Sequence, residues 1–168
     1  LGATTTRVSL TSFAATSSVV SELTYDSSQI DAAIAGLSAG GWTYLSGGLN
    51  AGLSTLAPAK VRAGAPHIMM VLTDGVQTIN GNDNDAIAAA ALVKASGALL
   101  FAVGFGGADQ DTLDAMASSP SSTFAIKTRD LAALQAYFTT GSRFCDLVSN
   151  QPPSAPLNAP YPLATSPS

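Results

Sequence analysis

The clearest hydrophobic pattern in the chain is a short apolar run that stops abruptly at an acid. Residues 68–72 are all apolar, and Thr73, Asp74 and Gly75 follow them. A short continuous run of this kind predicts a β-strand that is buried on both faces of a parallel sheet. The strand would deliver the Asp74 carboxylate to the C-terminal edge of the sheet, where open α/β sheets bind their ligands.

A second apolar run, residues 99–104, predicts another strand, which ends in the glycine-rich segment 104–107. Between the two runs, residues 83–97 are rich in alanine, carry Ile87 and Leu92 at helical spacing and close with a glycine. This pattern predicts a crossover helix. The three elements form a β-α-β unit, whose strands should be parallel.

The remaining elements are predicted from alternation and helical spacing. Residues 7–13 and 19–23 alternate apolar and polar side chains and predict a β-hairpin at a sheet edge. A helix is expected after Asp26, with Ile30, Ile34 and Leu37 on one face and an end at Gly40–Gly41. Further helices are expected over residues 46–57, 109–118 and 130–140, and a last strand is expected at 123–126. Residues 1–148 therefore form one domain.

The last segment, residues 149–168, has a different composition. It is rich in Pro, Ser, Ala and Thr without periodicity, so it cannot bury a core. We expect an extended linker or a glycosylated tail.

Charge and hydropathy exclude two classes of partner. The net charge is −4, and the seven Lys and Arg residues are scattered, which argues against nucleic acid. No apolar run approaches the length that spans a bilayer, so we expect no membrane insertion. Only 11% of the residues are charged, which suits an extracellular or assembly-embedded surface.

The single cysteine, Cys145, cannot close a disulfide within the chain. In a secreted protein it would pair with a cysteine elsewhere, and in a cytosolic protein it would be a small buried apolar side chain. The sequence leaves both alternatives open.

With these elements placed, the chain resembles the von Willebrand factor type A (vWA) domain, which is also the inserted domain of integrins. The resemblance spans residues 7–146 and implies an α/β fold: a doubly wound, mostly parallel open sheet with helices on both faces and one antiparallel edge strand. It rests on the following segments: residues 71–75 (Val-Leu-Thr-Asp-Gly), 41–46 (Gly-Trp-Thr-Tyr-Leu-Ser), 101–106 with Asp109 and Leu113, and 117–120.

The resemblance implies a divalent-cation site, the metal-ion-dependent adhesion site (MIDAS), at the top of the sheet. Thr43 matches the family's threonine ligand and Asp74 its aspartate ligand. Such oxygen donors suit Mg²⁺ or Ca²⁺ and leave a coordination position for an acidic side chain of a partner. The alternatives are that Asp74 caps a turn through Gly75 and that Thr43 caps the helix that follows.

The sequence departs from the family pattern in one respect. The Asp-x-Ser-x-Ser loop and the first strand of the family are missing from it. In this fold that strand is central, so its absence would leave unpaired backbone groups on two buried neighbours, at about 1–3 kcal/mol for each group. We expect an N-terminal segment or a partner strand to complete the sheet. The resemblance also implies that Cys145 pairs with a cysteine in that segment.

Enzymatic alternatives have little support. His67 is the only histidine, and it begins the strand that Asp74 ends, which separates the two by roughly 20 Å at about 3.3 Å per residue. Cys145 then has no base to activate it. Residues 104–107 lack the spacing of a dinucleotide loop, and residues 80–85 lack the spacing of an EF-hand.

The sequence therefore predicts a non-enzymatic adhesion or interaction module of an extracellular protein. Trp42 and Tyr44 flank Thr43 and would either contact the partner or pack over the helix. Other proteins, including matrix or filament subunits, are the expected partners. The alternative is a structural building block of an extracellular filament or matrix, with a degenerate, metal-free site.

Overall fold

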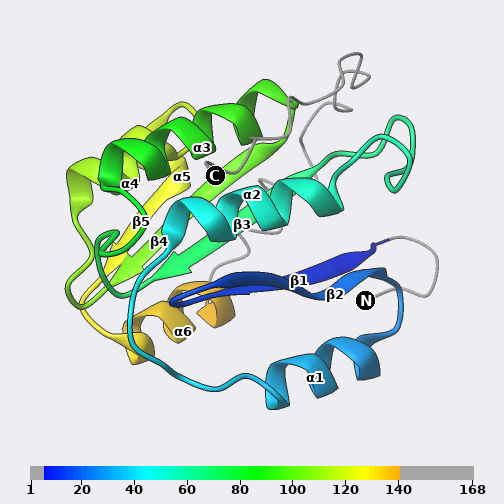
Figure 1. Ribbon diagram of the computed structural model, residues 1–168, viewed down its shortest axis with the longest axis horizontal. Coiled ribbons are helices and arrows are strands. Elements are labelled where there is room, and N and C mark those ends of the chain that lie inside the picture. Colours follow the sequence, from blue (N-terminus) through cyan, green and yellow to red (C-terminus); the bar gives the residue numbers. More distant parts are fainter. Residues whose placement is uncertain (1–5, 141–168) are drawn as a thin grey trace.

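The computed structural model describes residues 6–140 as an α/β domain (Figure 1). Five strands and six helices make up the described part of the chain. The strands are β1 (Val8–Phe13), β2 (Ser17–Thr24), β3 (Ile68–Thr73), β4 (Leu99–Phe105) and β5 (Ala125–Thr128). The helices are α1 (Ser27–Ala35), α2 (Leu45–Thr55), α3 (Asp83–Ala95), α4 (Gln110–Met116), α5 (Ser121–Phe124) and α6 (Leu131–Thr140).

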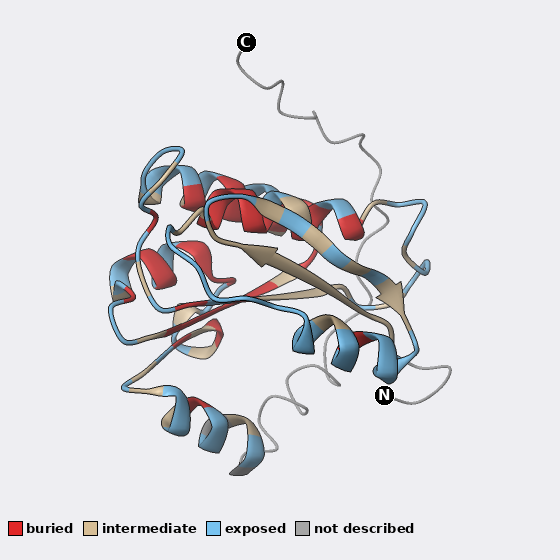
Figure 2. Cartoon of the chain, turned by 60° about the horizontal axis from the view of Figure 1, so that its bottom comes forward, coloured by how far each residue is buried: buried red, intermediate tan, exposed pale blue. Residues whose placement is uncertain are grey.

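Helices cover both faces of the strands. Figure 1 shows α2, α3, α4 and α5 on one face, and α1 and α6 on the other. The buried side chains lie mainly between β3–β5 and the helices of the first face, as the red segments of Figure 2 show. The ring of Phe124 meets Phe101 of β4 edge-on, with 4.9 Å between the ring centroids. No helix among residues 6–140 is long and apolar enough to cross a membrane.

The β-α-β unit expected from the sequence is confirmed. β3 pairs with β4 in parallel, with Ile68 opposite Leu99 and Thr73 opposite Gly104. The crossover helix α3 begins with a capping box, in which Asn82 and Asp85 satisfy each other's backbone N–H groups. This reciprocal cap explains why the helix starts at Asp83.

Two helix ends differ from the sequence prediction. α1 ends at Ala35, with Gly36 as its C-cap, and not at Gly40, because Ile34 and Leu37 find no core: they are 52% and 45% exposed. Residues 121–124 form the short helix α5, so that the last strand begins at Ala125 and not at 123. The packing of Phe124 against Phe101 favours the helical turn there.

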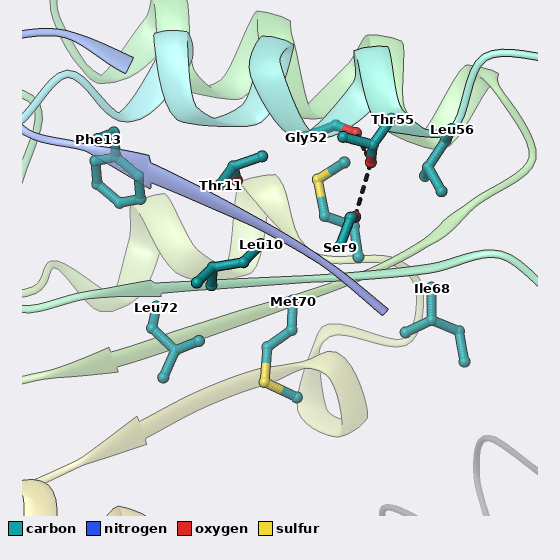
Figure 3. A pocket seen from close by; sticks show the side chains of 11 residues that line it. Ser9, Leu10, Thr11, Phe13, Gly52, Thr55, Leu56, Ile68, Met70 and Leu72 are labelled. Atoms are coloured by element: carbon teal, nitrogen blue, oxygen red, sulfur yellow. Dashed lines mark hydrogen bonds between the residues drawn. The ribbon is translucent and has the colours of Figure 1, made fainter. Parts of the chain in front are cut away.

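The strands form two separate sheets within the described residues. β1 and β2 pair antiparallel, as the hairpin pattern predicted, and β3, β4 and β5 pair in parallel. No strand of residues 6–140 hydrogen-bonds to the free edge of β1 or to that of β3. Both free edges line one cavity of about 200 Å³, shown in Figure 3. We call this space the strand slot.

Helix α2 joins the two sheets across the strand slot. The hydroxyls of Ser9 in β1 and Thr55 in α2 share a hydrogen bond over 2.9 Å, and the Tyr44 N–H at the helix start donates to the Ala14 carbonyl. Two glycines allow α2 to lie close to both the hairpin and β3. A Cβ on Gly48 would sit 2.7 Å from Cγ of Phe13 in the hairpin, and a Cβ on Gly52 would sit 3.0 Å from the terminal methyl of Met69 in β3.

We predict that Gly48→Ala destabilises the domain. The added methyl meets the Phe13 ring near its attachment point, and overpacking of this kind costs about 1–3 kcal/mol. The gain in helix propensity returns at most about 1 kcal/mol. Urea denaturation should therefore show a lower free energy of unfolding for Gly48→Ala.

Gly52→Ala is the matched control on the same helix. Its methyl meets only the flexible end of Met69, so we expect its free energy of unfolding to stay within about 0.5 kcal/mol of the parent. Equal losses in the two variants would contradict this account of how α2 holds the two sheets.

Candidate functional site

Three loops meet at the C-terminal edge of the parallel strands. They are residues 41–44 before α2, residues 74–82 after β3 and residues 106–109 after β4. The N–H of Gly107 donates to the Asp74 carbonyl over 2.9 Å, which joins the second loop to the third. The candidate residues Thr43 and Asp74 thus belong to one loop cluster.

Asp74 has an exposed side chain directly after β3. The turn at this point is made by its neighbour: the Thr73 hydroxyl donates to the Gly75 carbonyl over 2.8 Å and accepts the Gly75 N–H over 3.3 Å. Among residues 6–140 the Asp74 carboxylate has no hydrogen-bond or ion-pair partner. Thr73 therefore performs the turn-capping role that was the alternative explanation for Asp74.

Thr43 is fixed to the loop that carries Asp74. Its N–H donates to the Thr78 hydroxyl over 2.8 Å, and its carbonyl accepts the Thr78 N–H over 3.0 Å. Its own hydroxyl faces Gly75, since a Cβ built there would lie 3.9 Å from Thr43 Oγ1. The N-cap of α2 is Tyr44, without a side-chain cap. The structure thus brings the Thr43 hydroxyl next to the Asp74–Gly75 turn.

Gln77 fixes the loop after β3 to its neighbouring helices, and neither Gln77 nor Thr78 was predicted from the sequence. Gln77 is 6% exposed. Its side-chain oxygen accepts the Ser46 N–H at the start of α2 over 2.7 Å, and its backbone N–H donates to Asp83 over 2.9 Å. The loop after β3 is therefore fixed to both α2 and α3, which holds Asp74 and Thr43 in place.

The two aromatic residues beside Thr43 lie in different environments. Trp42 is 60% exposed, so its indole faces solvent at the rim of the site. Tyr44 is half-buried, and a Cβ on Gly47 would lie only 2.5 Å from its ring carbon Cδ1. Tyr44 therefore packs on α2, while Trp42 is available at the surface.

Asp109, in the third loop, has a structural task. It is the N-cap of α4, and its carboxylate accepts the Thr112 N–H over 2.8 Å and the Thr112 hydroxyl over 2.9 Å. These hydrogen bonds, the backbone one first, lower the pKa of the Asp109 carboxyl. Asp109 is thus committed to the helix, in contrast to Asp74.

The site offers oxygen donors, which suit a hard cation, but it offers only two such side chains within residues 6–140. Thr43 and Asp74 offer one hydroxyl and one carboxylate, and within residues 6–140 no group of three His, Cys, Asp or Glu side chains could hold a metal ion. Mg²⁺ keeps several waters and uses one or two carboxylates, whereas Ca²⁺ takes about 6–8 oxygen ligands. The two residues fit part of a cation site.

A family model for the von Willebrand factor type A domain matches residues 1–140. The chain belongs to the von Willebrand factor type A family. None of the curated proteins compared with this vWA domain matches it.

Solved structures share the fold at low sequence identity. Proximal thread matrix protein 1 from the mussel byssus, in a structure described as having a zinc-occupied MIDAS motif, is 22% identical with a TM-score of 0.68; the match covers 83% of this chain and 34% of that one. The pilus adhesin SpaC from Lactobacillus rhamnosus GG is 20% identical with a TM-score of 0.68, covering 86% and 25%. The SpRpn10 vWA domain is 16% identical with a TM-score of 0.61, covering 82% and 72%.

This vWA domain thus spans about a third or less of the length of the mussel and Lactobacillus chains. Cys145 and the segment 149–168 lie outside the described residues. Their expected disulfide and linker roles, and the boundary at residue 148, stay predictions.

We predict that Asp109 makes the domain sensitive to acid. Folding lowers the pKa of Asp109. The stabilisation that Asp109 provides is therefore complete above the ordinary pKa of an aspartate, about 4, and is lost as the pH falls through the lower pKa of the folded state. Asp109→Asn keeps an N-cap acceptor but removes the titration. Urea denaturation from pH 7 to pH 2.5 should show a shallower acid decline for this variant, and an unchanged decline would contradict the prediction.

Proposed function

We propose that this vWA domain is a non-enzymatic protein-interaction module that binds its partner through a divalent cation at Thr43 and Asp74. One observation carries the proposal: the Asp74 carboxylate is exposed, and in residues 6–140 it has neither a hydrogen-bond nor an ion-pair partner, while Thr73 holds the turn in its place. A carboxylate beside a hydroxyl, on loops fixed by Thr78 and Gln77, is prepared for a ligand from outside.

The chemistry follows from the donor set. Mg²⁺ or Ca²⁺ held by one carboxylate and one hydroxyl stays electrophilic and keeps exchangeable water, so that a carboxylate from a partner can enter its coordination shell. Thr43 and Asp74 orient the ion, and the exposed indole of Trp42 offers an apolar contact beside it. Tyr44 supports the loop through its packing on α2.

The remaining ligands would come from outside residues 6–140. A segment seated in the strand slot and parallel to β3 would end at the same edge as Asp74. The loop that follows it could then supply further oxygen donors. The cation site and the completed sheet are therefore expected together, with the added strand provided by an N-terminal segment or by a partner.

Two further features support an extracellular assembly as the setting. Charged residues make up only 11% of the sequence, and the segment 149–168 is rich in Pro, Ser, Ala and Thr. Two of the similar solved structures are named as a byssus matrix protein and a pilus adhesin. The second candidate, a structural building block with a metal-free site, is favoured by the small donor set of residues 6–140.

We predict that Asp74→Ala weakens the binding of Mn²⁺ and Mg²⁺ at least tenfold. Substitution of a residue that only hydrogen-bonds to a metal ligand already lowers metal affinity about 10–100-fold, and Asp74 would be a ligand itself. Isothermal titration calorimetry of the parent and the variant measures the change. Asp111→Ala, an exposed acid in the first turn of α4, is the matched control and should bind as the parent does.

Equal affinities for the parent and Asp74→Ala would contradict the cation-mediated function. That result would leave the structural building block as the better candidate.

A further inference from the structure

The loop after β3 contains a turn, residues 79–81, that is not held by backbone hydrogen bonds. Before the turn, Thr78 is joined to Thr43 by two hydrogen bonds, and after it Asn82 begins the capping box of α3. Within the described part of the chain, no N–H or carbonyl group of residues 79–81 makes a hydrogen bond. Asn80 and Gly81 are both exposed, so water reaches the peptide bond that joins them.

The backbone of this turn favours the two residues that are found there. The φ angle is 57° at Asn80 and 128° at Gly81, and asparagine and glycine are the residues that adopt positive φ most readily. A Cβ built on Gly81 would lie 2.8 Å from Cγ of Asp85, whose carboxylate accepts the Asn82 N–H. A side chain at position 81 would therefore be strained and would displace the acid that caps α3. The fold thus places an Asn-Gly pair at an exposed turn.

An asparagine that precedes a glycine has a nucleophile within its own main chain. The Gly81 nitrogen can close a five-membered ring with Cγ of Asn80, so the reaction needs no second protein group. Glycine has no side chain that could shield this nitrogen. Among residues 6–140, the Gly81 N–H also has no hydrogen bond that would have to break first.

We propose that Asn80–Gly81 is a site of covalent modification, at which Asn80 loses its amide through a cyclic imide. Hydroxide removes the proton from the Gly81 N–H, the nitrogen forms a bond to Cγ of Asn80, and the Cγ–Nδ2 bond breaks. The side-chain nitrogen leaves as ammonia, with a proton from water. Water then opens the ring: attack at Cγ gives aspartate, and attack at the main-chain carbonyl gives isoaspartate, whose main chain is one carbon longer.

Isoaspartate at this position changes the loop that carries Asp74. The Gln77 N–H donates to the Asp83 carboxylate over 2.9 Å, which closes a short loop around the turn. An additional main-chain carbon inside this loop moves its ends apart, so the hydrogen bond is lost. Gln77 also accepts the Ser46 N–H at the start of α2, so the change reaches that helix. This inference concerns the chain itself and stands independently of the cation-mediated function.

The test follows the conversion of each asparagine in the 168-residue chain. The chain is kept at mildly alkaline pH, and peptide mapping by mass spectrometry measures conversion. Asn80 should convert at least about tenfold faster than Asn50 within α2 and Asn84, which is followed by a hydrogen-bonded N–H, because these two must open locally first. The rate should rise with pH, because hydroxide removes the proton. Labelling by an isoaspartyl methyltransferase should detect isoaspartate at position 80.

A synthetic peptide of residues 76–86 separates the effect of the fold from that of the sequence. It contains the same Asn-Gly pair without the tertiary contacts. Asn80 in the folded chain should convert within about threefold of its rate in the peptide, because the turn has no hydrogen bonds that protect it. A rate at least about tenfold slower in the folded chain would overturn the inference, since the fold would then protect the pair.

Two variants assign the effect on the loop to isoaspartate. Freshly purified Asn80→Asp has the charge of the product with an ordinary main chain, and Asn80→Gln keeps the amide but would need a larger ring to react. Hydrogen exchange at the Gln77 amide should be at least about tenfold faster in the isoaspartate form than in the parent, because its hydrogen bond is lost. Both variants should exchange as the parent does. Ion exchange separates the isoaspartate form, which has one more negative charge.

Three further results would overturn the inference. The first is conversion of Asn80 no faster than that of Asn50 and Asn84. The second is aspartate without isoaspartate, which would indicate direct hydrolysis of the amide instead of a cyclic imide. The third is equal hydrogen exchange at the Gln77 amide in the isoaspartate form and in the parent.

Discussion

The close approach of α2 to both sheets is the constraint on which the rest of the structure depends. Without hydrogen bonds between β1 and β3, the hairpin and the parallel sheet are joined through this helix, by the Ser9–Thr55 hydrogen bond and by packing at Gly48 and Gly52. A side chain at Gly48 would hold α2 further from the hairpin, because its Cβ would meet the Phe13 ring. The width of the strand slot is therefore set in part by this glycine.

The same helix also positions the candidate cation site. Its first turn is fixed by Gln77, and the loop before it is fixed by Thr78, both of which belong to the loop after β3. The loops that carry the Asp74 carboxylate and the Thr43 hydroxyl are therefore held by one hydrogen-bond network, and not by a contact between the two groups. A site of this kind keeps its geometry without a bound ion, which lowers the cost of ordering it when a ligand arrives.

The two ends of the strand slot have opposite chemistry. The C-terminal edge carries the exposed Asp74, while the N-terminal edge carries Arg7 and Arg62.

The sequence by itself determined the β-α-β unit, the hairpin and the place of Asp74. Apolar runs that end in glycine and alternating apolar and polar positions are local patterns, so they identify elements without knowledge of the fold. The threonine loop at Thr43 was found through the family resemblance.

Only the tertiary structure decided which residues support these elements. That Gln77 is buried under α2 and that Arg7 and Arg62 share one cavity are contacts between segments far apart in the chain. The exposure of Ile34 and Leu37 likewise depends on what packs against α1, not on their spacing. Local patterns are encoded in neighbouring residues, whereas a buried support such as Gln77 and a slot between two sheets arise only when distant segments meet.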